Sequence, residues 1–99
     1  MKLIEINIAK ISELCHKFHV RRLFVFGSIL TDRFNDDSDV DFIVDFDRSK
    51  IKDIFETFFD FQFSLEALLG RRVDLIEEDA ISKPYFLNEV RSTKKLIYG

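Results

Sequence analysis

The sequence predicts an α/β or α+β fold, a small β-sheet flanked by helices, in a single domain that spans residues 1–99. The chain has 99 residues, and a second hydrophobic core would need roughly 50 more. Hydrophobic residues make up 46% and charged residues 33% of it, as in globular proteins. Segments with helical spacing of apolar residues alternate with segments rich in β-branched and aromatic residues, which is typical of a mixed fold.

The first half of the chain predicts a helix, a strand, a short helical stretch and a second strand. Apolar residues recur at helical spacing over residues 5–18. Residues 20–26 are mostly β-branched or aromatic and predict a strand. Residues 28–34 are expected to form one or two helical turns, with Ser28 as the N-cap. Residues 39–47 alternate between apolar and mostly acidic side chains, which predicts a strand with one face in the core.

The second half predicts helix, strand, helix and strand. A long helix is expected over residues 49–69, ended by Gly70. Residues 72–77 predict a third strand. Pro84 suits the first turn of a last helix, and residues 94–98 predict a short fourth strand.

Composition and charge argue against several classes of protein. No apolar run approaches the roughly 20 residues of a membrane span, and the N-terminus lacks the features of a signal peptide. The single cysteine, Cys15, cannot form an internal disulfide, so a cytoplasmic location is expected. The net charge of −3 argues against direct binding of nucleic acid, which favours a basic face.

The acidic segment 32–47 predicts a metal site. It contains seven aspartates and one arginine. Asp39 and Asp41 are placed on a strand whose other face is apolar, and side chains two apart on one face lie roughly 7 Å apart. Two carboxylates held there repel each other unless a proton or a cation intervenes, and Mg²⁺ suits such oxygen ligands. A solvated acidic loop is the preferred interpretation for three other aspartates of the segment: Asp36, Asp37 and Asp47.

Two further features belong with this pair. Gly27 and Ser28 follow a strand and precede a turn, a pattern that lets a phosphate approach the backbone closely. Asp74 lies among apolar strand residues, where an unpaired charge is costly. It is expected either to form an ion pair with Arg71, Arg72 or a lysine, or to complete a three-carboxylate site.

The helix predicted over residues 49–69 has more apolar surface than one face requires. Phe59 and Phe63 fall outside the main apolar stripe. Either a neighbouring element covers them, or they form an exposed patch for a homodimer or a partner protein. The stripe itself is expected to bury these residues: Ile51, Ile54, Phe55, Phe58, Phe61, Leu65, Leu68 and Leu69.

The motifs at residues 24–28, 38–44 and 73–75 resemble those of the minimal nucleotidyltransferases of the DNA polymerase beta superfamily. The resemblance implies a small mixed sheet flanked by helices and Mg²⁺-dependent transfer of a nucleoside monophosphate, most naturally AMP from ATP. It assigns metal binding and catalysis to three acids: Asp39 and Asp41 would hold two metals, and Asp74 would bind the catalytic metal and help deprotonate the acceptor hydroxyl.

The resemblance also assigns the triphosphate site to Gly27 and Ser28, with Ser38 beside them. The sequence departs from the family pattern at Thr31 and Asp32, where an arginine and a glycine are usual, and Arg33 is the available substitute.

The resemblance implies a partner as well. Members of this size are often antitoxins of a helical HEPN ribonuclease, and some adenylylate a tyrosine of that toxin. Two alternatives stay open: a binding module of the same fold that neutralises its partner by occlusion, without chemistry, and a small metal- or nucleotide-sensing domain.

Overall fold

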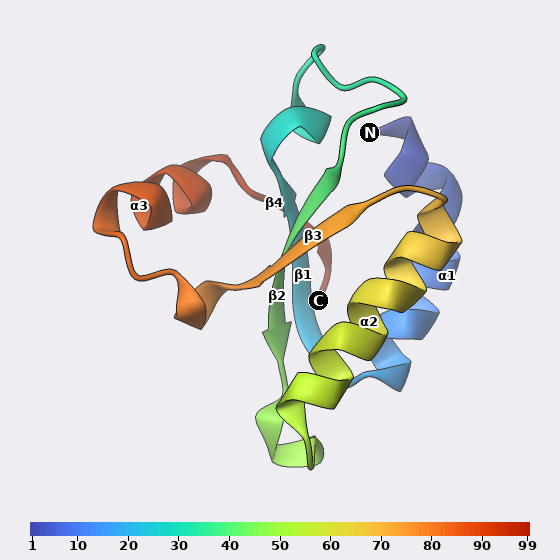
Figure 1. Ribbon diagram of the computed structural model, residues 1–99, viewed down its shortest axis with the longest axis vertical. Coiled ribbons are helices and arrows are strands. Elements are labelled where there is room, and N and C mark those ends of the chain that lie inside the picture. The colour runs from blue at the N-terminus through green and yellow to red at the C-terminus, as the bar shows by residue number, and fades with distance from the viewer.

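The computed structural model describes residues 1–99 as three α-helices and four strands in one sheet (Figure 1). The predicted α/β architecture is confirmed, as is the predicted order of elements. In chain order the helices and strands are α1 (Lys2–Lys17), β1 (Val20–Phe26), β2 (Val40–Phe46), α2 (Ile54–Leu69), β3 (Val73–Glu77), α3 (Pro84–Thr93) and β4 (Lys95–Tyr98). Short 3₁₀ turns lie at Gly27–Leu30, Arg48–Lys50 and Glu78–Ala80.

The sheet is mixed and has the strand order β3-β2-β1-β4. β1 pairs antiparallel with both β2 and β4, whereas β2 and β3 are parallel. Parallel neighbours need a crossover connection, and α2 supplies it. β2 is therefore a central strand, and β3 and β4 are the two edges.

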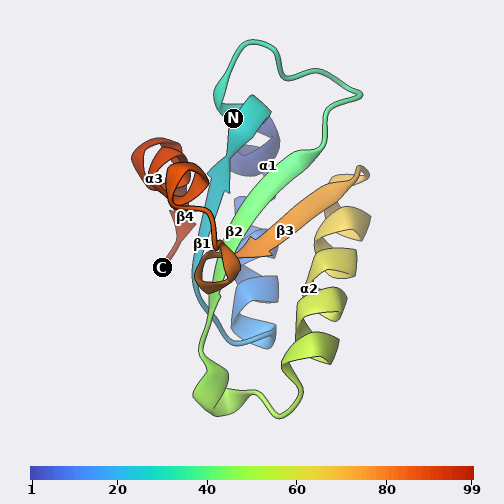
Figure 2. The ribbon, with the colours of Figure 1, turned by 60° about the vertical axis from the view of Figure 1, so that its left-hand side comes forward.

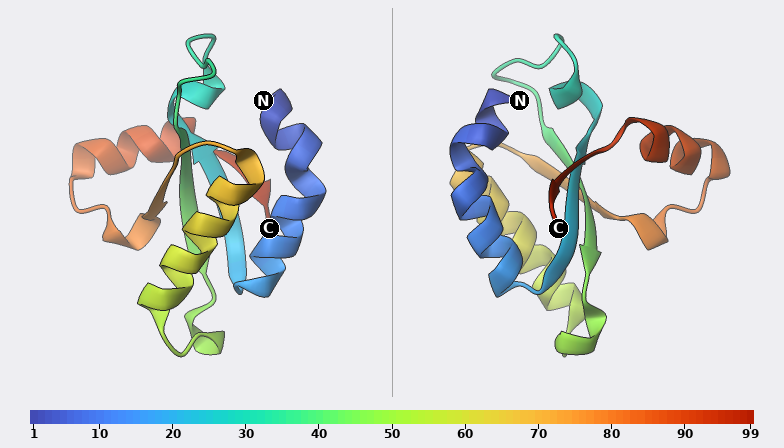
Figure 3. Two further views of the ribbon diagram at one scale, coloured as in Figure 1. Left: turned by 45° about the vertical axis from the view of Figure 1, so that its right-hand side comes forward. Right: turned by 180° about the vertical axis from the view of Figure 1, so that it is seen from behind.

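Helices cover the two faces of the sheet unequally (Figure 2). α1 and α2 lie side by side on one face (Figure 3) and enclose the main core. That core contains the alternating residues that the sequence places on the inner face of the second strand: Val40, Phe42, Val44 and Phe46. α3 covers part of the other face, where Phe24, Ile43 and Val90 form a small cluster.

Two helix boundaries differ from the predicted ones. α1 begins at Lys2 rather than residue 5, because the Met1 carbonyl accepts hydrogen bonds from the Ile4 and Glu5 amides. α2 begins at Ile54 rather than residue 49.

The late start of α2 has a local cause. The Asp53 carboxylate accepts a hydrogen bond from the Glu56 amide and caps the helix, so the preceding residues form a separate 3₁₀ turn. Gly70 ends α2 as predicted, with the left-handed φ of 67° that favours glycine.

No helix of the structure combines the length and the apolar character that a membrane crossing requires.

Candidate active site

Three carboxylates share one face of the sheet, at the end where β2 and β3 begin. Asp41 of β2 lies directly opposite Asp74 of β3 in the parallel register, so the two side chains point to the same face. Asp39 precedes β2 by one residue and lies two positions before Asp41. This is the face opposite the main core, because Val40 and Phe42 point into that core. Folding therefore brings Asp74 next to a pair that precedes it by more than thirty positions in the chain.

The carboxylate cluster has no cationic side chain paired with it. Burial raises the pKa of Asp41 from its ordinary value of 3.8 to about 6, and the neighbouring charges of Asp74 and then Asp39 add to the effect. Asp39 and Asp74 are exposed and Asp41 is half-buried. None of the ion pairs in the structure involves these three residues. The predicted alternative of an ion pair for Asp74 is therefore not observed.

The side chains as placed do not form a closed metal cage. No group of three or more carboxylate, imidazole or thiol side chains is arranged to hold a metal ion by itself. The donor set nevertheless suits a hard divalent cation, because three carboxylates on adjacent strands supply only oxygen and a bound cation relieves the repulsion at Asp41.

Gly27 lies against Asp41 of the neighbouring strand. β1 ends at Phe26, which pairs with Asp41 across the antiparallel ladder. Gly27 has a positive φ of 75°, and a Cβ at this position would collide with Asp41 Oδ2. Only glycine therefore allows the turn to approach Asp41 this closely, and the same missing Cβ leaves backbone accessible to a ligand.

Ser28 is not the N-cap that the sequence predicted. The 3₁₀ turn spans only Gly27–Leu30 and is capped at Phe26 without a side-chain hydrogen bond, so Ser28 lies inside it and is not the N-cap. The Ser28 carbonyl accepts hydrogen bonds from the Thr31 amide at 2.9 Å and from Thr31 Oγ1 at 2.8 Å. Thr31 thus ends the turn early, which explains why the expected helical stretch up to residue 34 does not form.

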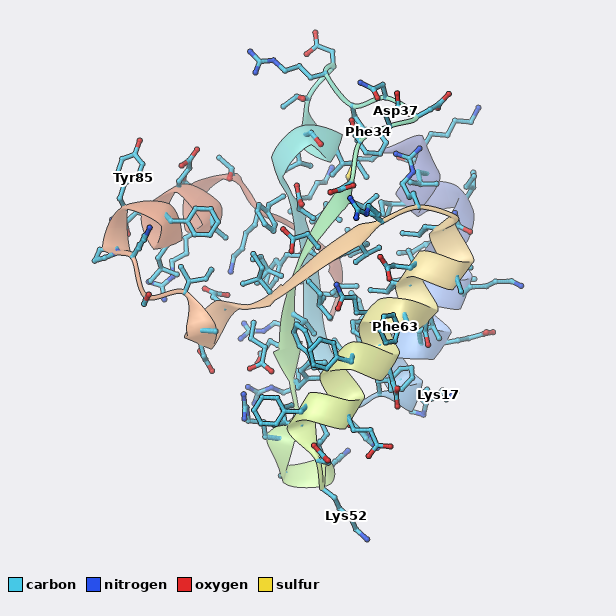
Figure 4. The ribbon with its side chains drawn as sticks, in the orientation of Figure 1. Lys17, Phe34, Asp37, Lys52, Phe63 and Tyr85 are labelled. Carbon is cyan, nitrogen blue, oxygen red and sulfur yellow. The ribbon has the colours of Figure 1, made fainter.

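The loop before Asp39 is held by an arginine whose role sequence reasoning missed. Arg71 Nη1 donates to the carbonyl of Asn35 at 3.0 Å and to that of Ser38 at 2.9 Å. The Arg71 guanidinium also lies 4.6 Å from the centre of the Phe34 ring. Figure 4 shows Phe34 and Asp37 in this outer loop. The only sequence signal was the position of Arg71 close to Asp74, which suggested a different partner.

The remaining predicted nucleotide-binding residues lie on the same loop but are not brought into one cluster. The Ser38 hydroxyl oxygen accepts a hydrogen bond from the Asn35 amide at 3.1 Å, which fixes it within the loop. Arg33 is exposed, and its guanidinium forms neither a hydrogen bond nor an ion pair with another residue. The structure leaves Arg33 free and does not place it against Gly27 and Ser28.

The other aspartates of the acidic segment are separate from the site. Asp36 and Asp37 are exposed, as expected for a solvated loop. Asp47 is half-buried and accepts hydrogen bonds from Ser49, which lower its pKa. The Asp45 pKa is also lowered, because hydrogen bonds from two arginines outweigh burial: Arg21 and Arg22.

Phe59 and Phe63 are exposed on α2, which agrees with the predicted exposed patch and not with cover by a neighbouring element. Their side chains are 49% and 62% exposed, and their rings stack with centres 6.5 Å apart. Figure 4 shows Phe63 on the outer side of the helix. Phe55, expected in the buried stripe, is 76% exposed, because it precedes Phe59 by one helical turn and shares its face. Ile51 lies outside α2 altogether.

Comparison with known proteins identifies the family. A family model described as polymerase beta nucleotidyltransferase matches residues 9–99, so the chain belongs to this family. The protein adenylyltransferase MntA of Thermococcus cleftensis is 42% identical over 71 residues, which cover 70% of this chain and 67% of that protein. The predicted enzyme class, nucleotidyltransferase, is confirmed.

Solved structures show the same fold. A protein provisionally described as a minimal nucleotidyltransferase superposes with a TM-score of 0.78 and 26% identity, over 95% of this chain and 92% of that one. A chain from the complex of the tri-AMPylated Shewanella oneidensis HEPN toxin with its MNT antitoxin superposes with a TM-score of 0.68 and 21% identity, over 96% of this chain and 71% of that one. The predicted small mixed sheet of a minimal nucleotidyltransferase is thereby confirmed.

Proposed function

We propose that this protein transfers AMP from ATP to a hydroxyl group of a partner protein, and that it acts in this way as the antitoxin of a HEPN-type toxin. The observation that carries the proposal is the direct pairing of Asp41 with Asp74, with Gly27 against the same carboxylate. The name of the Thermococcus relative supports protein adenylylation, and the description of the Shewanella complex supports a HEPN partner. A cytoplasmic location and the absence of direct nucleic-acid binding stay predictions from the sequence.

The three carboxylates are the proposed ligands of Mg²⁺: Asp39 directly before β2, Asp41 on β2 and Asp74 on β3. Mg²⁺ bound there would neutralise phosphate oxygens and polarise the transferred phosphoryl group. The fit rests on the pairing of Asp41 with Asp74 across β2 and β3. Burial, and then the charges of Asp74 and Asp39, raise the pKa of Asp41, and a bound cation would favour its ionised form. Phosphate oxygens of the nucleotide would supply further oxygen ligands.

The chain's own residues would position the nucleotide and handle a proton. Gly27 and Ser28 present an accessible backbone to the triphosphate, and Arg33 is free to reach it from the loop. Asp74 is exposed beside Asp41 and would accept the proton of the acceptor hydroxyl. The acceptor oxygen then forms a bond to the α-phosphorus, the bond to the β-phosphate oxygen breaks, and pyrophosphate leaves.

The test is transfer of label from α-labelled ATP to a HEPN-type partner, with Asp74→Asn as the variant. General-base assistance is typically worth about 10²–10⁴-fold, so the rate should fall by that order while the affinity for a non-hydrolysable ATP analogue changes little. Asp79→Asn is a matched control, since Asp79 is an exposed aspartate in the 3₁₀ turn after β3 and lies outside the site. Normal transfer by folded Asp74→Asn would refute the assigned role.

A second candidate is a binding module that neutralises its partner by occlusion. The observation in its favour is that Thr31, in place of the usual arginine, is hydrogen-bonded to Ser28. Arg33 contacts Thr31 through its backbone amide alone, and its guanidinium forms no hydrogen bond with the turn. Under this alternative the protein would inhibit its partner equally well with Asp39→Asn and Asp41→Asn together. Under the leading proposal that double variant would lose inhibition together with label transfer.

The partner is expected to contact the aromatic face of α2 formed by Phe55, Phe59 and Phe63. Three exposed phenylalanines on successive turns are an unusual apolar surface for a soluble helix. Burial of each ring is worth roughly 1.5–3 kcal/mol, so the face can contribute substantially to association. A second copy of the chain is the alternative occupant, and sedimentation of the protein alone separates the two.

A further inference from the structure

Along the outer edge of β3, side chains of α2 hydrogen-bond to the backbone of Val73 but not to that of Leu75. Gln62 Nε2 donates to the Val73 carbonyl at 2.9 Å, and the Glu66 carboxylate accepts from the Val73 amide at 3.0 Å. Both backbone groups of Val73 therefore point away from β2, and α2 satisfies them. Because backbone groups alternate in direction along a strand, those of Leu75 and the Glu77 amide also point outward. No side chain hydrogen-bonds to them.

An apolar groove of about 410 Å³ runs beside these open positions. Leu75 belongs to the main core on the side of α2, whereas Ile76 packs against the cluster on the side of α3. The groove therefore crosses the open edge of the sheet and does not lie on one face alone. Its apolar lining comes from α2, β3 and the 3₁₀ turn after β3: Ile54, Phe55, Phe58, Phe59, Leu75, Ile76 and Ala80.

Leu75 and Ile76 of the groove directly follow Asp74 on β3. Ile76 and Asp74 are two residues apart on β3 and share a face, which puts them roughly 7 Å apart along the strand. Any occupant of the groove that also pairs with Leu75 thus ends beside the exposed carboxylate of Asp74.

An extended segment can hydrogen-bond to the open backbone groups of β3 and place apolar side chains in the groove. Open strand edges are usually covered or blocked, and here the block stops after Val73. An α-helix in the groove would leave the Leu75 backbone groups without partners, because its own amides are already bonded. An added strand supplies both backbone partners and apolar side chains, as in other cases of β-augmentation.

We propose that an extended segment of the acceptor protein adds as a strand to β3 in this groove and carries its hydroxyl to Asp74. The proposal rests on the proposed function, since it names the way in which the acceptor is held. In such a pair the segment residue opposite Asp74 lies on the same face, with its Cβ about 5 Å away. The adjacent residue, opposite Leu75, points toward the phenylalanines of α2. The substrate is therefore a segment in which an apolar side chain directly neighbours the hydroxyl-bearing residue.

The test uses the full chain, labelled with ¹⁵N and free of nucleotide, and a blocked peptide as the probe: acetyl-Lys-Lys-Val-Leu-Tyr-Val-Lys-Lys-amide. We expect saturable shifts of the Leu75 and Glu77 amide signals. Methylation of the peptide's leucine amide nitrogen should abolish them, because it removes a backbone donor and keeps the side chain. Phe59→Ser should weaken the peptide Kd about tenfold. Tyr85→Ser is the control and should leave it unchanged, since Tyr85 is an exposed aromatic residue of α3 and does not line the groove.

Three results would overturn the inference. One is the absence of shifts at millimolar peptide. Another is equal binding of the methylated peptide, which would mean that only side chains dock. A third is that the same signals move with protein concentration alone, which would make a second copy the occupant.

The measurement also separates this inference from the proposed function. Peptide binding is read without ATP, so docking without label transfer would refute the transfer reaction while supporting the groove. Transfer to a HEPN-type partner without any effect of Phe59→Ser would support the reaction and refute the groove.

Discussion

Replacement of Asp41 by asparagine should stabilise the metal-free protein at neutral pH, although Asp41 is a proposed catalytic residue. The pKa of Asp41 is raised from 3.8 to about 6 in the folded chain, chiefly by burial and then by Asp74 and Asp39. A carboxyl whose pKa is raised by folding favours the folded state while protonated. This contribution is present in full below about pH 4 and is lost as the pH rises through about 6. Above that range the ionised carboxylate destabilises the fold, and asparagine removes the charge with little change in shape.

The magnitude follows from the shift. A displacement of about two pKa units corresponds to roughly 3 kcal/mol at 1.36 kcal/mol per unit. Because Asp41 is only half-buried, water screens part of this, and about 1–2 kcal/mol is the expected gain. In a chain of this size, each kcal/mol of change in the free energy of unfolding moves Tm by about 4–8 °C. Thermal unfolding in EDTA should therefore show a higher Tm for Asp41→Asn at pH 7.5 and little difference at pH 4.

Asp45→Asn is the matched control, since it changes the same residue type on the same strand and face. The Asp45 pKa is lowered, as hydrogen bonds from Arg21 and Arg22 outweigh burial. Its stabilising contribution is present above about pH 4 and is lost as the pH falls through the lowered pKa. Asp45→Asn should therefore lower Tm at pH 7.5, the opposite sign. An equal loss of stability in both variants would refute the electrostatic account of Asp41. Mg²⁺ with a non-hydrolysable ATP analogue should raise Tm of the wild type more than that of Asp41→Asn.

Three further predictions concern the surroundings of the site. Gly27→Ala should cost about 1–3 kcal/mol in urea unfolding and weaken nucleotide binding, because the new Cβ meets Asp41 and the positive φ is strained; unchanged stability would show that the turn relaxes freely. Arg71→Ala should raise hydrogen exchange in the loop before Asp39 and lower the rate of transfer, since it removes two hydrogen bonds to loop carbonyls; a fall in Tm with normal transfer would leave Arg71 a purely structural residue. Phe59→Ser with Phe63→Ser should weaken association with the partner in sedimentation at nearly constant Tm, because both rings are exposed; a large fall in Tm without loss of association would show that they stabilise the monomer.

Local patterns in the sequence predicted the elements well and their ends less well. The β1 strand and the end of α2 at Gly70 agree with the prediction, because β-branched runs and a glycine C-cap act locally. The predicted start of α2 was wrong. The helix begins after the N-cap Asp53, and the stretch before Asp53 is equally polar, so the sequence pattern did not separate the two possible starts. Phe55 was placed on the wrong face because the helix turns by about 100° per residue, and one end of a broad stripe necessarily leaves the core.

The site was predictable in its residue types and not in its geometry. The placement of Asp39 and Asp41 on one face follows from the period of two of an extended chain. The pairing of Asp41 with Asp74 depends on the parallel register of β2 and β3, which no local pattern specifies. The hydrogen bonds from Arg71 to the carbonyls of residues 35 and 38 could not be predicted either. Every residue has a backbone carbonyl, so the sequence does not indicate which ones accept from a side chain.

The crossover between β2 and β3 also sets the order in which the site can assemble. Gly27 and Asp41 meet within an antiparallel pair of neighbouring strands, so they come together after closure of a short loop. Asp74 joins them only when α2 has formed and docked, a contact between residues far apart in sequence and correspondingly slow to form. A partly folded chain can thus present the nucleotide turn and two acids without the third. The repulsion among the carboxylates opposes the last step of folding, so Mg²⁺ and nucleotide should slow the release of β3 more than they affect the β1–β2 hairpin.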